Sequence, residues 1–225
     1  MPTRRISGTA TASSEPDNGG DHSGGGGSGE TYVDDVFSTY LYEGNLGNPK
    51  KITNGIDLAG KGGLVWIKRR DGSGENYFID TERGRAKHLR SNTSAAEGSS
   101  PATNDLTSFN NNGFTLGVTY HNTNYVSPGN PCTYASWSFR KAPGFFDVVT
   151  YTGNSSTGQV INHSLGSVPG CIIIKRTDST SDWYVYHVGH SFAPGEGLAL
   201  NLNASGSSTY RALQSVPTST TFTAY

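Results

Sequence analysis

The stretch Gly63-Leu64-Val65-Trp66-Ile67-Lys68-Arg69 decides the fold, because it returns later in the chain as Gly170-Cys171-Ile172-Ile173-Ile174-Lys175-Arg176. Both stretches start at a glycine and end in Lys-Arg, and the shift between them is 170 − 63 = 107 residues. Short apolar runs bounded by turn residues predict β-strands. Because neither run alternates with polar residues, we expect each to be a central strand that is covered on both faces or lies near the centre of its sheet.

The similarity extends to both sides of this stretch. Ile52 aligns with Ile161 at a shift of 161 − 52 = 109 residues, and Phe114 aligns with Phe222 at 222 − 114 = 108. The small changes in shift fall between the expected strands, where turns tolerate insertions. An ordered series of matches of this kind predicts an internal repeat. We therefore expect two tandem copies of one all-β unit, at residues 32–141 and 142–225.

Each copy is expected to form an antiparallel β-sandwich. Opening strands are predicted at residues 36–42 and 145–151, and the Asn-Gly-rich segment 110–113 predicts a turn. Residues 134–140 alternate in polarity, so successive side chains point to opposite faces of a strand. We expect the core to receive the more apolar face, which consists of Ala135, Trp137 and Phe139.

The two ends of the sequence differ from this pattern. Residues 1–31 hold almost no large apolar side chains and end in a glycine-rich run, so we expect either a disordered tail or an extended arm that anchors the chain in a larger assembly. The second copy reaches Tyr225 without a counterpart of residues 134–140. A sandwich without that strand has an open edge. We expect the natural chain to continue past Tyr225, the alternative being that another chain supplies the strand.

Charge and composition narrow the range of partners. The formal net charge is −1, so no overall positive field attracts nucleic acid or an anionic membrane. No apolar stretch approaches the roughly 20 residues of a membrane helix, and none follows the N-terminus as in a secretory signal. Cys132 and Cys171 are expected to remain unpaired, with Cys171 packed as a small hydrophobic residue.

The acidic residues give a weak case for catalysis. Asp80 and Glu82 have the spacing of two carboxylates on one strand face, as in glucanases of the jelly-roll type. The second copy has His187-Val188-Gly189 at the corresponding place, and Arg83 follows directly. We therefore expect Asp80 and Glu82 to form ion pairs or to cap a turn, and we predict no catalytic residue.

Metal and cofactor sites are not expected either. His187 and His190, near Asp182, would face opposite ways on a strand, so they do not converge on one metal ion. Two loops are rich in the oxygen ligands that calcium prefers, but ordinary turn chemistry explains both. These loops contain Asp105 with Asn110, Asn111 and Asn112, and Asp71 with Gly72, Gly74 and Glu75.

The strands and turns resemble a module of structural proteins of tailed bacteriophages, particularly marine ones, that often belong to tail fibres or receptor-binding proteins. The resemblance covers most of residues 33–190. It implies a concanavalin-A-like or laminin-G-like jelly roll in each copy and a place in the virion. The matching pieces are Gly63–Lys68, Asp80–Gly84, Leu89–Asn92, Ser108–Phe109, Asn112–Gly117, Tyr134–Arg140, Phe145–Gly153, His163–Gly166 and Val168–Gly170.

The sequence thus predicts a bacteriophage virion structural protein without enzymatic activity or cofactor, assembled in the host cytoplasm. The leading hypothesis is the N-terminal part of a homotrimeric tail fibre, whose arm contacts other virion proteins. The alternatives are a lectin-like module that binds host surface glycans, a capsid decoration protein and, least favoured, a glycan hydrolase. Aromatic and amide side chains bind sugars well, and an irregular loop offers such candidates for ligand contact. They are Tyr120, His121, Asn122, Asn124 and Tyr125.

Overall fold

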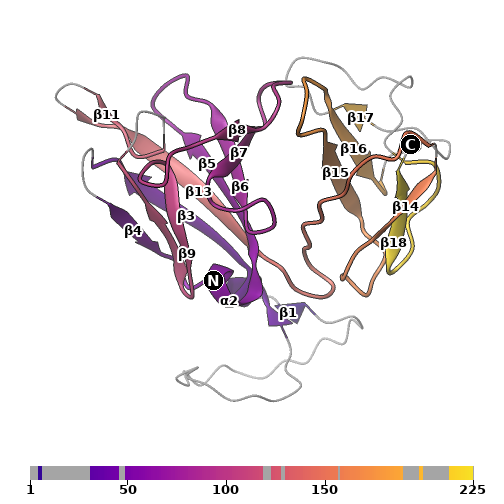
Figure 1. Ribbon diagram of the computed structural model, residues 1–225. Helices are drawn as coiled ribbons and strands as arrows, with labels where there is room; N and C mark the ends of the chain where they lie inside the picture. Colours follow the sequence, from indigo (N-terminus) through magenta and orange to yellow (C-terminus); the bar gives the residue numbers. More distant parts are fainter. Residues whose placement is uncertain are drawn as a thin grey trace.

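The protein is predominantly β, with several antiparallel sheets, as the sequence predicts. Figure 1 shows the computed structural model. Its two described helices, α1 (Val33–Val36) and α2 (Leu58–Lys61), have four residues each. In the described part of the chain, no helix has the length and apolar character to cross a membrane. The structure describes residues 5–6, 31–45, 49–118, 123–127, 130–156, 158–189, 198–199 and 213–224.

The first half of the chain forms two sheets that share one core (Figure 1). The larger sheet has the order β3 (Phe37–Glu43), β13 (Thr133–Arg140), β5 (Gly63–Arg69), β6 (Asn76–Asp80), β7 (Lys87–Arg90) and β8 (Gly98–Ser99). The smaller sheet has the order β4 (Lys50–Thr53), β10 (Gly113–Leu116) and β9 (Leu106–Asn110). The core between them includes Tyr42, Ile52, Val65, Ile67, Tyr77, Ile79, Leu106, Phe114, Leu116 and Tyr134.

Two short ribbons complete this half. β1 (Arg5–Ile6) pairs with β2 (Thr31–Tyr32), and β11 (Val126–Ser127) pairs with β12 (Asn130–Pro131). The predicted turn at residues 110–113 is confirmed, since it joins β9 to β10 and Gly113 has a positive φ of 141° that favours glycine.

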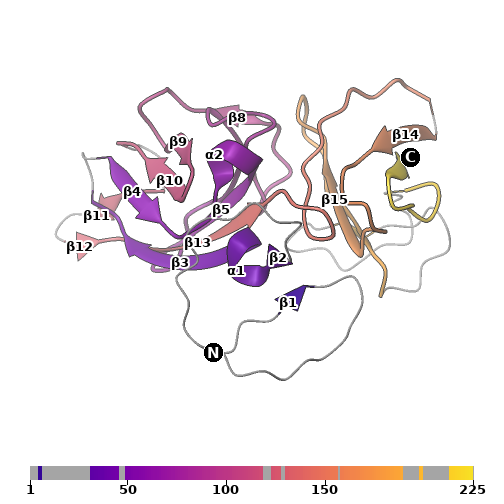
Figure 2. The ribbon, with the colours of Figure 1, turned by 90° about the horizontal axis from the view of Figure 1, so that it is seen from below.

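The second half forms a two-stranded and a three-stranded sheet, which lie beside the first half in both ribbon views (Figures 1 and 2). β14 (Gln159–Asn162) pairs with β18 (Thr221–Ala224). The other sheet has the order β15 (Cys171–Lys175), β16 (Trp183–His187) and β17 (Leu198–Ala199). The core of this half contains Ile161, Leu213, Phe222 and Ala224, against which Ile172, Ile174, Tyr184 and Tyr186 pack.

Residues that align between the two copies also pair in the same register. Ile52 lies opposite Phe114 in the first half, and the aligned Ile161 lies opposite Phe222 in the second. The ladder of β5 with β6 likewise has the register of the ladder of β15 with β16. In the first, Trp66, Ile67 and Lys68 pair with Phe78, Tyr77 and Asn76, and in the second, Ile173, Ile174 and Lys175 pair with Val185, Tyr184 and Trp183.

The face of β13 that points to the core is the opposite of the predicted one. Tyr134, Ser136 and Ser138 are fully buried between the two sheets. The ring of Tyr134 stacks on Tyr42 with 5.0 Å between centroids, and the hydroxyl of Ser138 accepts a hydrogen bond of 2.9 Å from Asn54. The prediction failed because burying the hydroxyls costs little once they are hydrogen-bonded.

Trp137 and Phe139 of β13 instead lie on the outer face of the large sheet, where Phe139 meets the second half. Trp137 packs on Trp66 at 4.9 Å, and Phe139 packs on Phe146, which follows β13, at 5.3 Å. Phe78 of β6 meets Trp183 of β16 edge to face at 5.5 Å. This aromatic layer joins the two halves, because rings in such geometries add about 0.5–1.5 kcal/mol per pair beyond the area they bury.

Hydrogen bonds at one edge of the aromatic layer reinforce the joint. The indole Nε1 of Trp183 donates to the carbonyl of Thr93 at 2.9 Å. Two backbone bonds lie nearby, from the amide of Ser181 to the carbonyl of Ser94 at 2.9 Å and from the amide of Glu97 to the carbonyl of Thr177 at 2.8 Å. The loop before β8 is therefore bound directly to the loop between β15 and β16.

Two expectations for the second half are wrong. Residues 145–151 form no strand, since their one sheet-like contact is an isolated bridge between Ala142 and Phe146. β15 is an edge strand within the described residues, whereas β5 is central, and Cys171 is exposed. Both differences have one cause. In the first half β13 pairs with β3 and β5, and no described segment fills that place in the second half.

We expect the buried core contacts to contribute most of the free energy of unfolding of the first half. Leu116→Ala, on a fully buried side chain, should lower the free energy of unfolding by about 2–5 kcal/mol through lost burial and a residual cavity. Leu41→Ala removes the same atoms from a strand position that is 58% exposed, and should change it by less than about 0.5 kcal/mol. Urea unfolding followed by circular dichroism measures both, and similar losses would contradict this assignment of the core.

Candidate functional site

The loop predicted to contact a ligand is described only in part. Tyr120, His121 and Asn122 lie outside the described residues. Asn124 is fully buried, and its side-chain amide donates to Asn45 Oδ1 at 2.8 Å and to the carbonyl of Gly117 at 3.1 Å. Asn124 therefore ties this loop to the segment after β3 rather than presenting its amide at the surface.

Tyr125 is half-buried against the core of the first half. Its backbone amide donates to the hydroxyl of Tyr134 at 3.0 Å, which fixes the end of the loop to β13. Ligand contact by the remaining part of the loop stays a prediction.

A buried polar cluster lies next to this loop, and no sequence motif indicated it. The hydroxyl of Ser100 donates to Asp105 and lies 3.2 Å from Nδ1 of His88. Thr123 donates to the other oxygen of Asp105 at 3.2 Å, and its carbonyl accepts from the hydroxyl of Tyr42 at 2.7 Å. Burial raises the pKa of Tyr42, and the nearby Tyr134 and Asp105 raise it further.

The residue types serine, histidine and aspartate suggest a catalytic triad, but their order in space is wrong for one. In a triad the imidazole lies between the hydroxyl and the carboxylate, so that it can take the proton of the nucleophile. Here the hydroxyl of Ser100 lies between His88 and Asp105, and all three residues are buried. The cluster holds the loop before β9 against the loop after β10.

The acidic residues Asp80 and Glu82 have different partners. Asp80 is buried, accepts from the backbone amide of Arg83 at 2.9 Å and pairs with the Arg83 guanidinium, with its Oδ2 at 2.6 Å from Nε. Arg83 also contacts Glu97 at 3.2 Å. The predicted turn cap and ion pair are thus confirmed, and Glu82 pairs instead with Lys141 at 2.7 Å.

The acidic residue Asp71 of one calcium-type loop has partners within the fold. Asp71 pairs with Arg69 at 2.7 Å and accepts from the amide of Thr133 at 3.0 Å. Its hydrogen bond with Arg69 holds the pKa of Asp71 below the usual value. Among the described residues, no group of three or more His, Cys, Asp or Glu side chains is placed to hold a metal ion. His190, from the other metal candidate, lies outside them.

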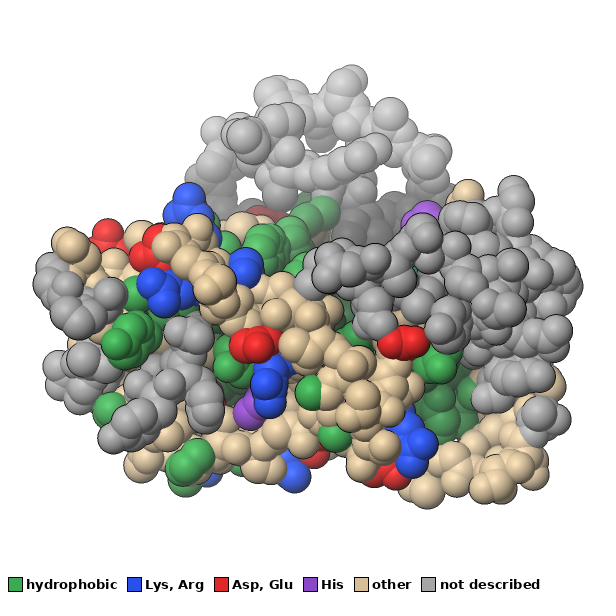
Figure 3. Space-filling view, turned by 90° about the horizontal axis from the view of Figure 1, so that it is seen from above, with side chains coloured by type: hydrophobic (Ala, Val, Ile, Leu, Met, Phe, Trp, Pro, Cys, Tyr) green, Lys and Arg blue, Asp and Glu red, His purple; other side chains and the backbone are tan. Residues whose placement is uncertain are grey.

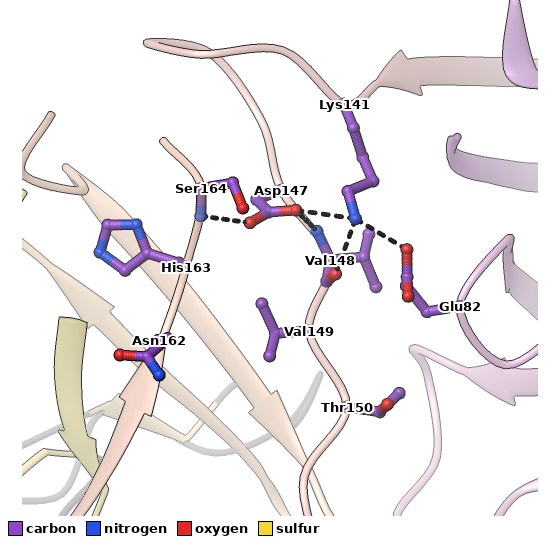
Figure 4. A pocket seen from close by; sticks show the side chains of 9 residues that line it. All are labelled: Glu82, Lys141, Asp147, Val148, Val149, Thr150, Asn162, His163 and Ser164. Atoms are coloured by element: carbon purple, nitrogen blue, oxygen red, sulfur yellow. Dashed lines mark hydrogen bonds and ion pairs between the residues drawn. The ribbon is translucent and has the colours of Figure 1, made fainter. Parts of the chain in front are cut away.

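A pocket of about 270 Å³ lies at the joint between the two halves (Figure 4). Lys141, at the end of β13, reaches into it and pairs with Glu82 at 2.7 Å and with Asp147 at 3.1 Å. Asp147 also accepts from the backbone amide of Ser164 at 2.7 Å. The pocket is lined by Glu82, Lys141, Asp147, Val148, Val149, Thr150, Asn162, His163 and Ser164.

The charged side chains of this pocket form ion pairs with one another. Burial alone would lower the pKa of Lys141, but its hydrogen bonds to Glu82 and Asp147 outweigh this effect and raise the pKa. The ammonium group thus stays charged and bound to two carboxylates. On the face shown in Figure 3, basic and acidic side chains are likewise interspersed rather than gathered by sign. The pocket therefore has the chemistry of an ion-paired joint between the turn after β6, the end of β13 and the start of the second half.

The comparison with protein families gives one result. Residues 33–224 match the profile described as a domain of unknown function, DUF7483. The chain belongs to the DUF7483 family. No curated protein and no solved structure matches it. The DUF7483 match runs through both halves and the joint, so the family domain includes both.

We expect the two acids near the joint to differ in their effect on stability. Asp80→Asn removes the negative charge next to Arg83, whose side chain is only 9% exposed, and should cost about 3–5 kcal/mol of unfolding free energy. Glu82→Gln acts on a partly exposed pair and should cost less than about 1 kcal/mol. Urea unfolding of the two variants, followed by tryptophan fluorescence, measures the difference. A smaller loss of unfolding free energy for Asp80→Asn than for Glu82→Gln would contradict this prediction.

Proposed function

We propose that this DUF7483 chain is a structural protein of a tailed-bacteriophage virion and forms the N-terminal part of a tail fibre. In this proposal two tandem jelly-roll-like sandwiches act as a building block, and residues 1–31 attach it to neighbouring virion proteins. The sequence resemblance to phage structural modules supports the virion assignment. Assembly as a homotrimer in the host cytoplasm belongs to the same proposal.

The observation that carries a structural role is the way the two halves are connected. Aligned strand pairs repeat in register, and the halves meet through ring contacts of Phe78 with Trp183 and of Phe139 with Phe146. Lys141 bridges the joint with two ion pairs. A joint with both aromatic packing and ion pairs resists bending of one half against the other. Such stiffness suits a chain that holds other parts of an assembly at a fixed distance.

A building block rather than an enzyme is also supported by the state of its acids. A glycan hydrolase requires two carboxyl groups that face one substrate from opposite sides. Asp80 is buried against Arg83, and Glu82 is bound to Lys141. Both acids therefore serve as partners of cations within the fold.

Location in the particle tests this proposal. Immunogold labelling, or density from electron cryomicroscopy of the phage that encodes the chain, should place it on the tail. Density at the centres of the capsid capsomers would instead make it a decoration protein and contradict the tail-fibre assignment.

Deletion of residues 1–31 tests the role of the arm. The shortened chain loses the β1–β2 ribbon but should keep the thermal midpoint of the full chain, because both cores lie beyond residue 31. Its incorporation into particles, measured by quantitative immunoblotting of purified virions, should fall to background. Normal incorporation of a folded, shortened chain would overturn the anchoring role.

A further inference from the structure

The open edge of β15 carries hydrogen-bonding groups that point away from its partner β16. In an antiparallel ladder, the amides of alternate residues point to the same side of the strand. The carbonyl of Gly170 accepts from the amide of Val188 at 2.8 Å, so the even-numbered residues of this strand bond to β16. The amides of Cys171, Ile173 and Lys175 therefore point to the other side, where no described strand lies.

The aligned edge in the first half has the same geometry and is occupied. The carbonyl of Gly63 accepts from Thr81 at 3.0 Å, at positions that align with Gly170 and Val188 because 170 − 63 and 188 − 81 both equal 107. On the other side of β5, Arg70 donates to the carbonyl of Thr133 at 2.8 Å, and β13 pairs along the full length of β5. β13 thus fills the place that is open beside β15.

An ion pair at the end of β5 is repeated at the end of β15. Arg69 holds Asp71 at 2.7 Å, and Asp71 accepts the amide of Thr133, the first residue of β13. In the second half Arg176 holds Asp178 at 2.5 Å, with 176 − 69 = 178 − 71 = 107. Arg69 is 20% exposed and Arg176 is 59% exposed, so among the described residues the second ion pair lacks the strand that accompanies the first.

The other flank of the open place is also without a strand partner among the described residues. β3 pairs with the second edge of β13, and the segment aligned with β3, residues 145–151, forms no ladder. Its Val149 and Tyr151 are exposed, and so is Ile173 of β15, at 47%. Exposed apolar side chains along an unpaired edge mark a surface that can receive another strand.

We propose that the edge of β15 binds, in trans, one extended strand of a partner polypeptide that has the alternation of β13, which is the alternative to a strand from a continuation of the chain itself. The strand runs antiparallel to β15, and the Asp178 carboxylate accepts its first amide. Residues with hydroxyl or small side chains face the core of the second half, and aromatic residues face outward, with the aromatic residue equivalent to Trp137 opposite Ile173. Main-chain bonds supply affinity and the alternating side chains supply selectivity in this mode of recognition. The edge has these properties whether or not the chain belongs to a virion.

A peptide with the sequence of residues 133–140 tests the proposal on the full chain. At saturating peptide, hydrogen exchange at the amides of Cys171, Ile173 and Lys175, resolved by NMR, should slow by about tenfold or more. A peptide in which proline replaces the residue equivalent to Trp137 is the matched control, because it lacks an amide that would face β15. This control should give no slowing.

Two variants of the chain separate strand addition from nonspecific adhesion. Ile173→Pro removes one outward amide and leaves the bonds to β16, so the exchange of β16 amides should not change while peptide protection of Cys171 and Lys175 is lost. Ile173→Val keeps the amide and should retain protection. The proposal is overturned if the peptide protects none of these amides, or if it protects Ile173→Pro as well as Ile173→Val. Protection that appears without peptide and rises with chain concentration, together with dimers in sedimentation, would identify a second copy as the occupant and also overturn it.

Discussion

The pairing of β13 on both of its edges is the constraint on which the rest of this structure depends. β13 lies between β3 and β5 and is in register with both, so its backbone joins the edge strand β3 to the rest of the six-stranded sheet. Its inner face brings Tyr134 into the core of the first half, and its outer face brings Phe139 to Phe146 of the second half. One strand therefore connects the sheet, the core and the joint. Its last residue also leads directly to Lys141, which bridges the halves by ion pairs.

In the second half, no described strand fills the corresponding place. The cluster of buried residues there is smaller than that of the first half, and aromatic side chains such as Tyr184 and Tyr186 pack on it only partly buried. β15 has one neighbour instead of two within the described residues, and residues 145–151 have no ladder to join. The outer face of β16 is nevertheless protected, because Trp183 is buried against Phe78 of the first half. The first half thus covers part of the outer face of the second.

Much of this fold could be predicted from the sequence, because its signals are local. The repeated apolar runs, the turn at residues 110–113 and the alternation in β13 each depend on residues close together in the chain. Which face of β13 meets the core could not be predicted, since that depends on distant contacts of its outer face, where Trp137 packs on Trp66 and Phe139 packs on Phe146. The edge position of β15 was missed for a similar reason: apolar runs of the same length occur in central and edge strands, and the neighbouring strand decides.

In the candidate site, too, local contacts could be predicted and contacts between distant residues could not. The ion pair of Asp80 with Arg83 could be predicted because the two residues are only three positions apart. Asn124, in contrast, was expected at a surface that contacts a ligand. It is buried because Asn45, far away in the sequence, supplies its hydrogen-bond partners. The pocket at Lys141 had no sequence signal, as its parts come from both copies.

Native-state hydrogen exchange of the free chain, compared residue by residue between β5 and β15, tests the central role of β13 most directly. The account predicts that the amides of Leu64, Trp66 and Lys68, which face β13, exchange only when the first half unfolds, while those of Cys171, Ile173 and Lys175 exchange orders of magnitude faster. Equal protection of the two sets in a monomeric chain would contradict it.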